Sequence, residues 1–259
     1  MNHAKMNRLG LIALSVAATL GQSGCDGTSG GGGPDGGRNY RLEGAAVKDP
    51  ALGYLAVSAD LTSEGAPVYS AEIKFGPDQL TLRLDSAFYQ VVRMASAYPS
   101  GNYHLYVRDS TLLNDSIATR LPGDFQIETV LPATGEKRSI DVVTLDWSPS
   151  SVTDGYVMAA VKRTSAYSGA GFSQYVTSGA TAGTYPNEAF SLPSGDPDTG
   201  MYDLYVYSYV GSPDSILARV SLPVPMPSRL VDNIARKDVE GRFGTVVVTP
   251  RGSIRVTQQ

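Results

Sequence analysis

Side chains that commonly carry acid–base or nucleophilic chemistry are scarce in this chain. There are two histidines, and His3 stands in an N-terminal segment that we expect to be removed, so a Ser-His-Asp arrangement would depend on His104 alone. The alternation around His104 places it on the outward face of a strand, where a solvated imidazole is expected. No nucleophile elbow, phosphate loop or His-Glu-x-x-His helix follows residue 24. We therefore predict a protein that is not an enzyme and has no cofactor.

Paired carboxylates offer a second route to catalysis. Glycoside hydrolysis needs two acids held about 5 Å or about 6.5–9.5 Å apart. The spacing of the candidates in this chain does not distinguish them from surface acids, so an envelope glycoside hydrolase that assembles carboxylates across a domain junction stays an alternative function. The candidates are Asp60, Glu64, Glu72, Asp146 and Asp154.

The segment from Asp196 to Gly200 reads Asp-Pro-Asp-Thr-Gly and could begin a calcium loop. An EF-hand loop starting at Asp196 would need a glutamate at position 207, where the chain has Tyr207. We therefore predict a polar turn here and no metal site.

Tyrosine is the last residue type with functional potential, with 15 Tyr against 6 Phe and 1 Trp. Tyr205, Tyr207 and Tyr209 are predicted to project from one face of a strand, and Tyr106 takes the equivalent place earlier in the chain. Such rings can contact a glycan or a protein partner, so these four are the predicted ligand-contact residues. The alternative is that they pack beneath a neighbouring loop or domain.

The N-terminal segment has the layout of a secretory signal. Lys5 and Arg8 precede an apolar run from Leu9 to Leu20, and small residues follow up to Gly24. A helix of that run would be about 18 Å long, well short of the roughly 30 Å hydrocarbon core of a bilayer. We therefore expect residues 1–24 to be a signal peptide that is cleaved.

Cys25, the single cysteine of the chain, follows Ser23 and Gly24 directly. This arrangement resembles the lipobox of bacterial lipoproteins. The resemblance implies that the mature chain begins at Cys25 and carries a diacylglycerol on its thiol and an acyl chain on its amine, which suffices for stable anchoring. It also implies a location in the bacterial cell envelope, on the periplasmic face of a membrane or at the cell surface.

The residues after Cys25 are rich in glycine, so we expect residues 25–39 to form a lipidated, flexible tether. The remainder has the composition of a globular protein, since the chain is 42% hydrophobic and 18% charged. The net charge of −4 is typical of a soluble surface and argues against a nucleic-acid partner.

An internal repeat divides the globular part into two. The stretch from Gly101 to Val107 recurs from Gly200 to Val206, and the same shift maps Asp115-Ser116-Ile117 onto Asp214-Ser215-Ile216. Between the matching stretches, short segments rich in β-branched and aromatic residues alternate with Gly, Pro, Ser and Asp. Two copies of one β unit follow from this pattern.

The alternation within each repeat predicts which side chains face a core. Tyr103, Leu105 and Val107 share one face, as their counterparts from Tyr202 to Val206 do. The Gly-x-Tyr-x-Leu-Tyr-Val pattern resembles the tyrosine-corner strand of immunoglobulin-like and fibronectin type III sandwiches. It is equally similar to a strand of transthyretin-like domains, so both topologies stay open.

The predicted fold is all-β, with two tandem immunoglobulin-like Greek-key sandwiches after the signal peptide and tether. The first spans residues 40–124 and the second residues 125–224. Residues 225–259 contain two strand-like segments around Pro250, Arg251 and Gly252, which predict a β-hairpin that completes or caps the second sandwich. The predicted function is non-catalytic binding or scaffolding by a lipid-anchored envelope protein with a protein or glycan partner.

Overall fold

Two stacked β-sheets form the first half of the chain in the computed structural model, which describes residues 40–110, 112–163, 171–219, 221–228 and 231–258. Cys25 and the predicted tether lie outside the described residues. The strands of one sheet lie in the order β1, β2, β7 and β6, and those of the other in the order β5, β4, β8 and β9. Their bounds are β1 (Tyr40–Asp49), β2 (Tyr54–Ser63), β4 (Glu72–Phe75), β5 (Asp78–Gln79), β6 (Thr81–Arg83), β7 (Phe88–Met94), β8 (Gly101–Asp109) and β9 (Leu113–Leu121).

This order is that of an immunoglobulin-like Greek key. The chain changes sheet between β2 and β4, between β5 and β6, and again between β7 and β8. A two-residue strand, β3 (Ala66–Pro67), pairs with the end of β2. A single 3₁₀ turn (Ala95–Ala97) leads from β7 towards β8.

The second half repeats this order. A sheet of β10, β12 and β15 covers one side of the core, and β14, β13, β16 and β19 line the other, with β11 pairing in parallel with β19. A short 3₁₀ helix (Asn187–Phe190) connects β15 to the turn before β16. The strand bounds are β10 (Ile127–Leu131), β11 (Glu136–Lys137), β12 (Val143–Trp147), β13 (Gly155–Lys162), β14 (Phe172–Val176), β15 (Ala182–Tyr185), β16 (Gly200–Gly211) and β19 (Gly252–Val256).

The tyrosine corner predicted for both repeats is present. The Tyr103 hydroxyl donates to the carbonyl of Pro99 at 2.9 Å, and the Tyr202 hydroxyl donates to the carbonyl of Asp198 at 3.1 Å. Leu105 and Leu204, two residues further along, are completely buried. The two matching stretches therefore take the same place in the two sandwiches, as strands β8 and β16.

The two repeats differ after these strands. In the first, the chain turns directly into β9, which contains Asp115-Ser116-Ile117. In the second, Pro213 and Asp214 precede a short helix, α1 (Ser215–Arg219), although the match between the repeats would predict a strand there. The Asp214 carboxylate accepts hydrogen bonds from the amides of Ile216 and Leu217 at 3.0 and 2.9 Å, as a helix N-cap does. The similarity of Asp214-Ser215-Ile216 to Asp115-Ser116-Ile117 thus does not extend to their structure.

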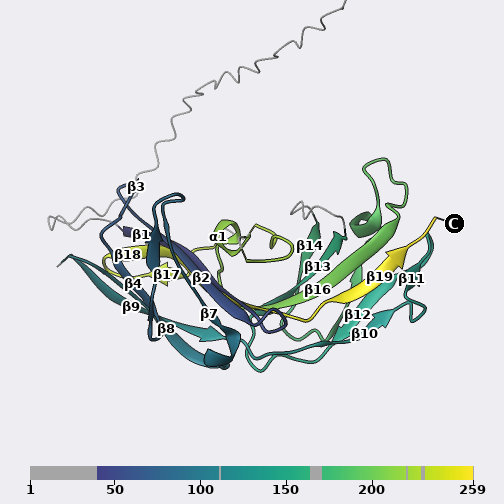
Figure 1. The fold of residues 1–259 in the computed structure, drawn as a ribbon, viewed down its shortest axis with the longest axis horizontal. Coiled ribbons are helices and arrows are strands. Elements are labelled where there is room, and N and C mark those ends of the chain that lie inside the picture. Colours follow the sequence, from purple (N-terminus) through teal and green to yellow (C-terminus); the bar gives the residue numbers. More distant parts are fainter. Residues whose placement is uncertain (1–39, 111, 164–170, 220, 229–230, 259) are drawn as a thin grey trace, which may run out of the picture. The chain divides into compact units, whose positions relative to one another are not determined.

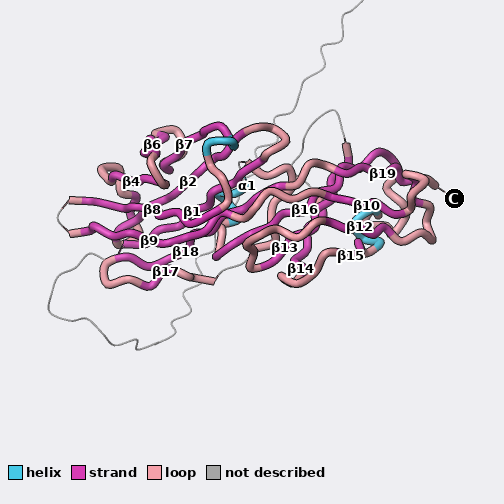
Figure 2. The backbone as a smooth tube through the Cα atoms, turned by 90° about the horizontal axis from the view of Figure 1, so that it is seen from below, coloured by secondary structure: helices cyan, strands magenta, loops and turns pink. Residues whose placement is uncertain are grey.

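The predicted C-terminal hairpin is wrong, because its two strands do not pair with each other. Strand β18 (Val239–Val248) pairs in parallel with β1 over Val239–Val247 and antiparallel with the end of β16, while β19 pairs with the beginning of β16. A two-residue strand, β17 (Ile234–Ala235), pairs with the beginning of β18. Strand β18 thereby joins the two sandwiches into one continuous sheet, in which β16 and β18 meet (Figure 1; Figure 2 shows the same strands turned by 90°).

A second, smaller core lies on the outer face of this continuous sheet. The segment that contains α1 runs over β1, β13, β16 and β18 and buries apolar side chains against them; Figure 1 shows α1 above the middle of the sheet. The segment contributes Ala218, Leu222, Val224 and Met226.

A buried ion pair fastens this segment to the sheet. The Arg242 guanidinium on β18 donates from Nε and Nη2 to one oxygen of Asp214 at 2.8 and 2.7 Å, and both side chains are largely buried. Arg242 also lies 3.0 Å from the Glu43 carboxylate on β1. Because Asp214 caps α1 and binds β18 at once, this carboxylate links the helix to the strand that joins the sandwiches.

Candidate functional site

The tyrosines of β16 do not form an open ligand surface. Tyr205, Tyr207 and Tyr209 do share one face, as predicted, but each is at most 7% exposed. The Tyr207 hydroxyl donates to the carbonyl of Val224 at 3.1 Å and accepts from its amide at 3.0 Å. The segment with α1 therefore covers these rings, which is the alternative that the sequence left open.

Tyr106, the fourth predicted contact residue, has the opposite environment. It is 46% exposed on the outer face of the sheet β5–β4–β8–β9, where nothing in the described part of the chain covers it. The difference between the two repeats explains this, since the chain after β8 turns into β9 and does not fold back over the sheet. The first sandwich therefore keeps open the face that the second one buries.

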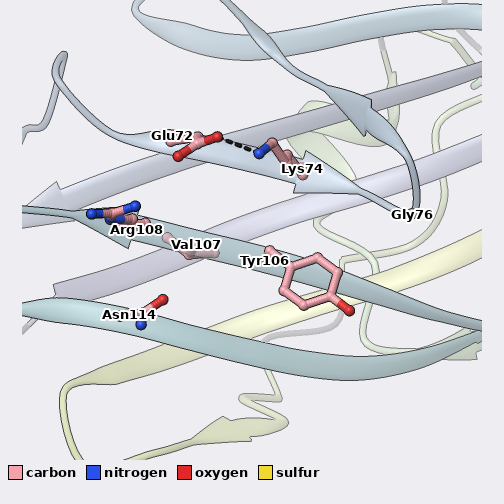
Figure 3. A pocket seen from close by; sticks show the side chains of 7 residues that line it. All are labelled: Glu72, Lys74, Gly76, Tyr106, Val107, Arg108 and Asn114. Carbon is pink, nitrogen blue, oxygen red and sulfur yellow. Dashed lines mark ion pairs between the residues drawn. The ribbon is translucent and has the colours of Figure 1, made fainter.

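Strand register decides which side chains surround Tyr106. Residues directly opposite each other on antiparallel strands share a face, so Lys74 and Ser116 flank Tyr106. One row further along β8, Arg108 stands between Glu72 on β4 and Asn114 on β9. All of these side chains except Ser116 line a shallow depression of about 350 Å³, which Figure 3 shows with Tyr106 at one end and Arg108 at the other.

The charged side chains in this depression are the Glu72 carboxylate and the cations of Lys74 and Arg108. Lys74 and Glu72 form an ion pair, and this contact lowers the pKa of the Glu72 carboxyl. Arg108 makes no ion pair within 4.0 Å among the described residues. The depression therefore offers a guanidinium, an amide from Asn114 and an aromatic ring to a ligand.

His104 extends the site along β8. Its ring stacks beside that of Tyr106, with the centroids 5.7 Å apart and the planes at 25°, and its Nδ1 lies 2.9 Å from the Ser116 hydroxyl. The imidazole is exposed, as predicted from the alternation. It has no carboxylate partner among the described residues that could complete a triad.

The candidate catalytic acids are not brought together as a pair. Glu64, Glu72 and Asp154 each line a different depression. Asp154 is held by the Gly211 amide at 2.8 Å and lies 3.7 Å from Arg120. Asp146 lies on β12, in the small sheet of the second sandwich.

Asp60 is the one candidate acid with acidic neighbours, on the outer face of β1 and β2. It stands directly opposite Glu43 in the sheet, and burial, then Glu43 and Asp214, raise the pKa of its carboxyl. Glu43 is held by Arg41 at 3.1 Å and by Arg242 at 3.0 Å. These contacts fit a structural role for the cluster.

The raised pKa of Asp60 predicts a pH-dependent stability. An acid with a raised folded-state pKa favours folding only while it is protonated, so this contribution is complete below its unfolded pKa of about 3.9 and is lost as the pH rises through the folded value. We expect Asp60→Asn to raise Tm at pH 7 by about 1–4 °C, because it removes a like-charge pair across two strands. Thermal unfolding followed between pH 3 and 7 measures this gain, which should vanish towards pH 3.

Asp85→Asn is the matched control. Contacts with Ser86 and Arg83 lower the pKa of the exposed Asp85 carboxyl, so its stabilisation is present at neutral pH and is lost on acidification. This variant should gain nothing at pH 7. An Asp60→Asn protein that is less stable than the wild type at pH 7 would contradict the assignment.

The turn before β16 is held by contacts within the chain. Asp198 binds Lys162 and accepts from the Tyr202 hydroxyl at 2.9 Å, while Asp196 accepts from the Ser194 hydroxyl at 2.9 Å. The described residues contain no group of three or more His, Cys, Asp or Glu side chains placed to hold a metal ion.

The sheet order and the tyrosine corners define the chain as a tandem immunoglobulin-like β-sandwich protein. No family model and no curated relative matches it. Among solved structures, it is similar to the FN1–FN3 domains of chicken CNTN1, with 10% identity, a TM-score of 0.26 and coverage of 85% of this chain and 65% of that one. Similarity to a cytokine receptor complex has 14% identity, a TM-score of 0.28 and coverage of 82% and 94%.

The adhesin InvE of Yersinia pseudotuberculosis is also similar, with 15% identity, a TM-score of 0.23 and coverage of 64% of this chain and 55% of the adhesin. At these scores the three likenesses carry no argument about function. The described residues hold no helix with the length and apolar character needed to cross a bilayer.

Proposed function

We propose that this protein is a lipid-anchored component of the bacterial cell envelope that binds a partner without catalysis, through the outer face of its first sandwich. The observation that carries the proposal is the open face around Tyr106, where an exposed ring, a guanidinium with no ion pair within 4.0 Å among the described residues, and an amide line one depression. Exposed Tyr and Arg side chains are the types that most often dominate binding energy at protein interfaces. The continuous sheet built around β18 supports a scaffolding role, because it connects the two sandwiches through paired strands.

A photoreactive amino acid at position 106, expressed in intact cells, tests the binding face. Adducts are expected from position 106, and Tyr106→Ala should weaken binding of the captured partner at least tenfold, the effect of about 1.4 kcal/mol. Tyr69 is the matched control, since it is 55% exposed but lines a different depression. Equal adducts from positions 106 and 69, or none from either, would argue against the face.

Glycan binding is the second candidate function, because the depression combines an aromatic ring with hydrogen-bonding side chains. A glycan array probed with the wild type and with Tyr106→Ala separates the two candidates. Retention of an oligosaccharide by the wild type alone favours a glycan, whereas protein adducts without array signal favour a protein partner.

The anchor is tested separately through Cys25. With the thiol replaced in Cys25→Ser, no lipid can be attached, and we expect the protein to move from the membrane pellet to the soluble fraction on fractionation. Mass spectrometry of the wild-type N-terminus should find acyl groups on Cys25. If Cys25→Ser remains in the membrane pellet, lipidation is not what holds the protein there.

A further inference from the structure

Two lysines of this chain are equally buried, but only Lys48 forms an ion pair with a carboxylate among the described residues. Lys48 and Lys137 are each 4% exposed. The Nζ of Lys48 lies 2.7 Å from the carboxylate of Asp124. Lys137 has no carboxylate within 4.0 Å among the described residues. A buried charge is costly unless an opposite charge compensates it, so Lys137 is the exception that needs an explanation.

The contacts of Lys137 come from neutral groups. Its Nζ donates to the carbonyls of Arg138 and Asp141 at 3.1 and 2.9 Å, and it lies 5.9 Å from the ring centroid of Phe190. The nearby carboxylate of Asp141 is engaged by Arg138, at 2.9 Å from its amide and 3.0 Å from its Nε. Burial lowers the pKa of the Lys137 ammonium, and the Asp141 carboxylate opposes this shift only in part.

A small cavity adjoins this ammonium at the end of the second sandwich. It has a volume of about 140 Å³, and Lys137 and Phe190 line it together with polar residues. The polar residues are Ser139, Asn187 and Ser191. At about 30 Å³ per water molecule, the space holds a ligand of roughly four or five heavy atoms.

We propose that this cavity is a binding site for a carboxylate, which forms the direct ion pair that Lys137 does not make with any described residue. An acetate-sized group fits the volume, its two oxygens can accept from the ammonium and from the side-chain amide of Asn187, and its methyl end can face Phe190. The site lies in the second sandwich and does not depend on the face around Tyr106.

Thermal unfolding in sodium acetate, compared with sodium chloride at equal ionic strength, tests the proposal. A ligand that binds only the folded state raises Tm with the logarithm of its concentration, so at ten times Kd acetate should raise Tm about 3–6 °C above the chloride value. Lys137→Met should abolish the difference between the two salts. Lys48→Met is the matched control and should keep it.

A charge placed in the cavity gives an independent test that does not need Lys137 to be removed. Asn187→Asp supplies a carboxylate at the same site, so this variant should unfold at a higher Tm than the wild type and should no longer respond to acetate. A short peptide with a free C-terminal carboxylate, compared with its amide, then separates a small acid from the carboxylate of a protein partner. Equal Tm values in acetate and chloride for the wild type, or an acetate effect that survives in Lys137→Met, would overturn the proposal.

Discussion

Replacing Gly241 by alanine is expected to lower the free energy of unfolding by about 3–5 kcal/mol. Gly241 lies on β18 with a φ of +129°, and a Cβ at this position would stand 2.0 Å from the carbonyl oxygen of Leu42 on β1. Leu42 is the residue paired with Gly241 in the sheet, and the clash is with its backbone. The clash therefore cannot be relieved by moving a flexible side chain. Urea unfolding followed by circular dichroism measures the loss.

Gly53→Ala is the control that separates backbone strain from the clash. Gly53 has a φ of +78°, and a Cβ there would meet nothing within 4 Å. Gly53→Ala should lower the free energy of unfolding by the cost of one residue in a left-handed conformation, about 1–2 kcal/mol. Equal losses in Gly53→Ala and Gly241→Ala would show that the contact with β1 is not the decisive factor.

Arg242→Met is expected to destabilise the protein by about 3–5 kcal/mol, because it leaves the buried Asp214 carboxylate without its cation. Asp214→Asn in the same chain should restore part of the loss, since the amide carries no charge. Chemical unfolding of the single and double variants measures the coupling. Arg120→Met, which breaks an exposed ion pair of 3.7 Å with Asp154, should cost at most about 1 kcal/mol. A loss of this smaller size in Arg242→Met would contradict the structural role of the buried pair.

The alternation of apolar residues was sufficient to predict the strands that form each core. Leu105, Val107, Leu204 and Val206 face inward as their spacing indicates, because a strand turns successive side chains to opposite faces. The repeat likewise located the equivalent strands of the two sandwiches, since the tyrosine corner depends on residues four positions apart. These features depend on residues that are close together in the chain, and a single sequence is sufficient to predict them.

The path of the chain after β16 depends on contacts between distant residues. Pro213 and Asp214 are a signal for a helix start that the match with Asp115 concealed. The pairing of β18 with β1 joins residues about 200 positions apart, and no periodicity encodes it. For the same reason the burial of Tyr207 could not be read from its own strand, whose alternation is equally compatible with an open face and a covered one.

The cavity beside Lys137 could not be predicted from the sequence, for a different reason. Lys137 stands in a two-residue strand between turns, where a lysine is normally solvated. Its burial arises because Phe190 and the segment around Asn187 close over it from another part of the chain. Lys48, which is equally buried, forms an ion pair with Asp124, whereas Lys137 forms none with the described residues.

The parallel pairing of β1 with β18 also determines how the protein bears mechanical load. The chain before Tyr40 leads to Cys25, and the C-terminal end of β18 leads into the second sandwich. Traction between these points pulls the two parallel strands in opposite directions along their length, so nine paired residues resist it in shear at the same time and do not open one after another. Force applied between Tyr40 and the second sandwich would therefore load all nine residue pairs of this seam together.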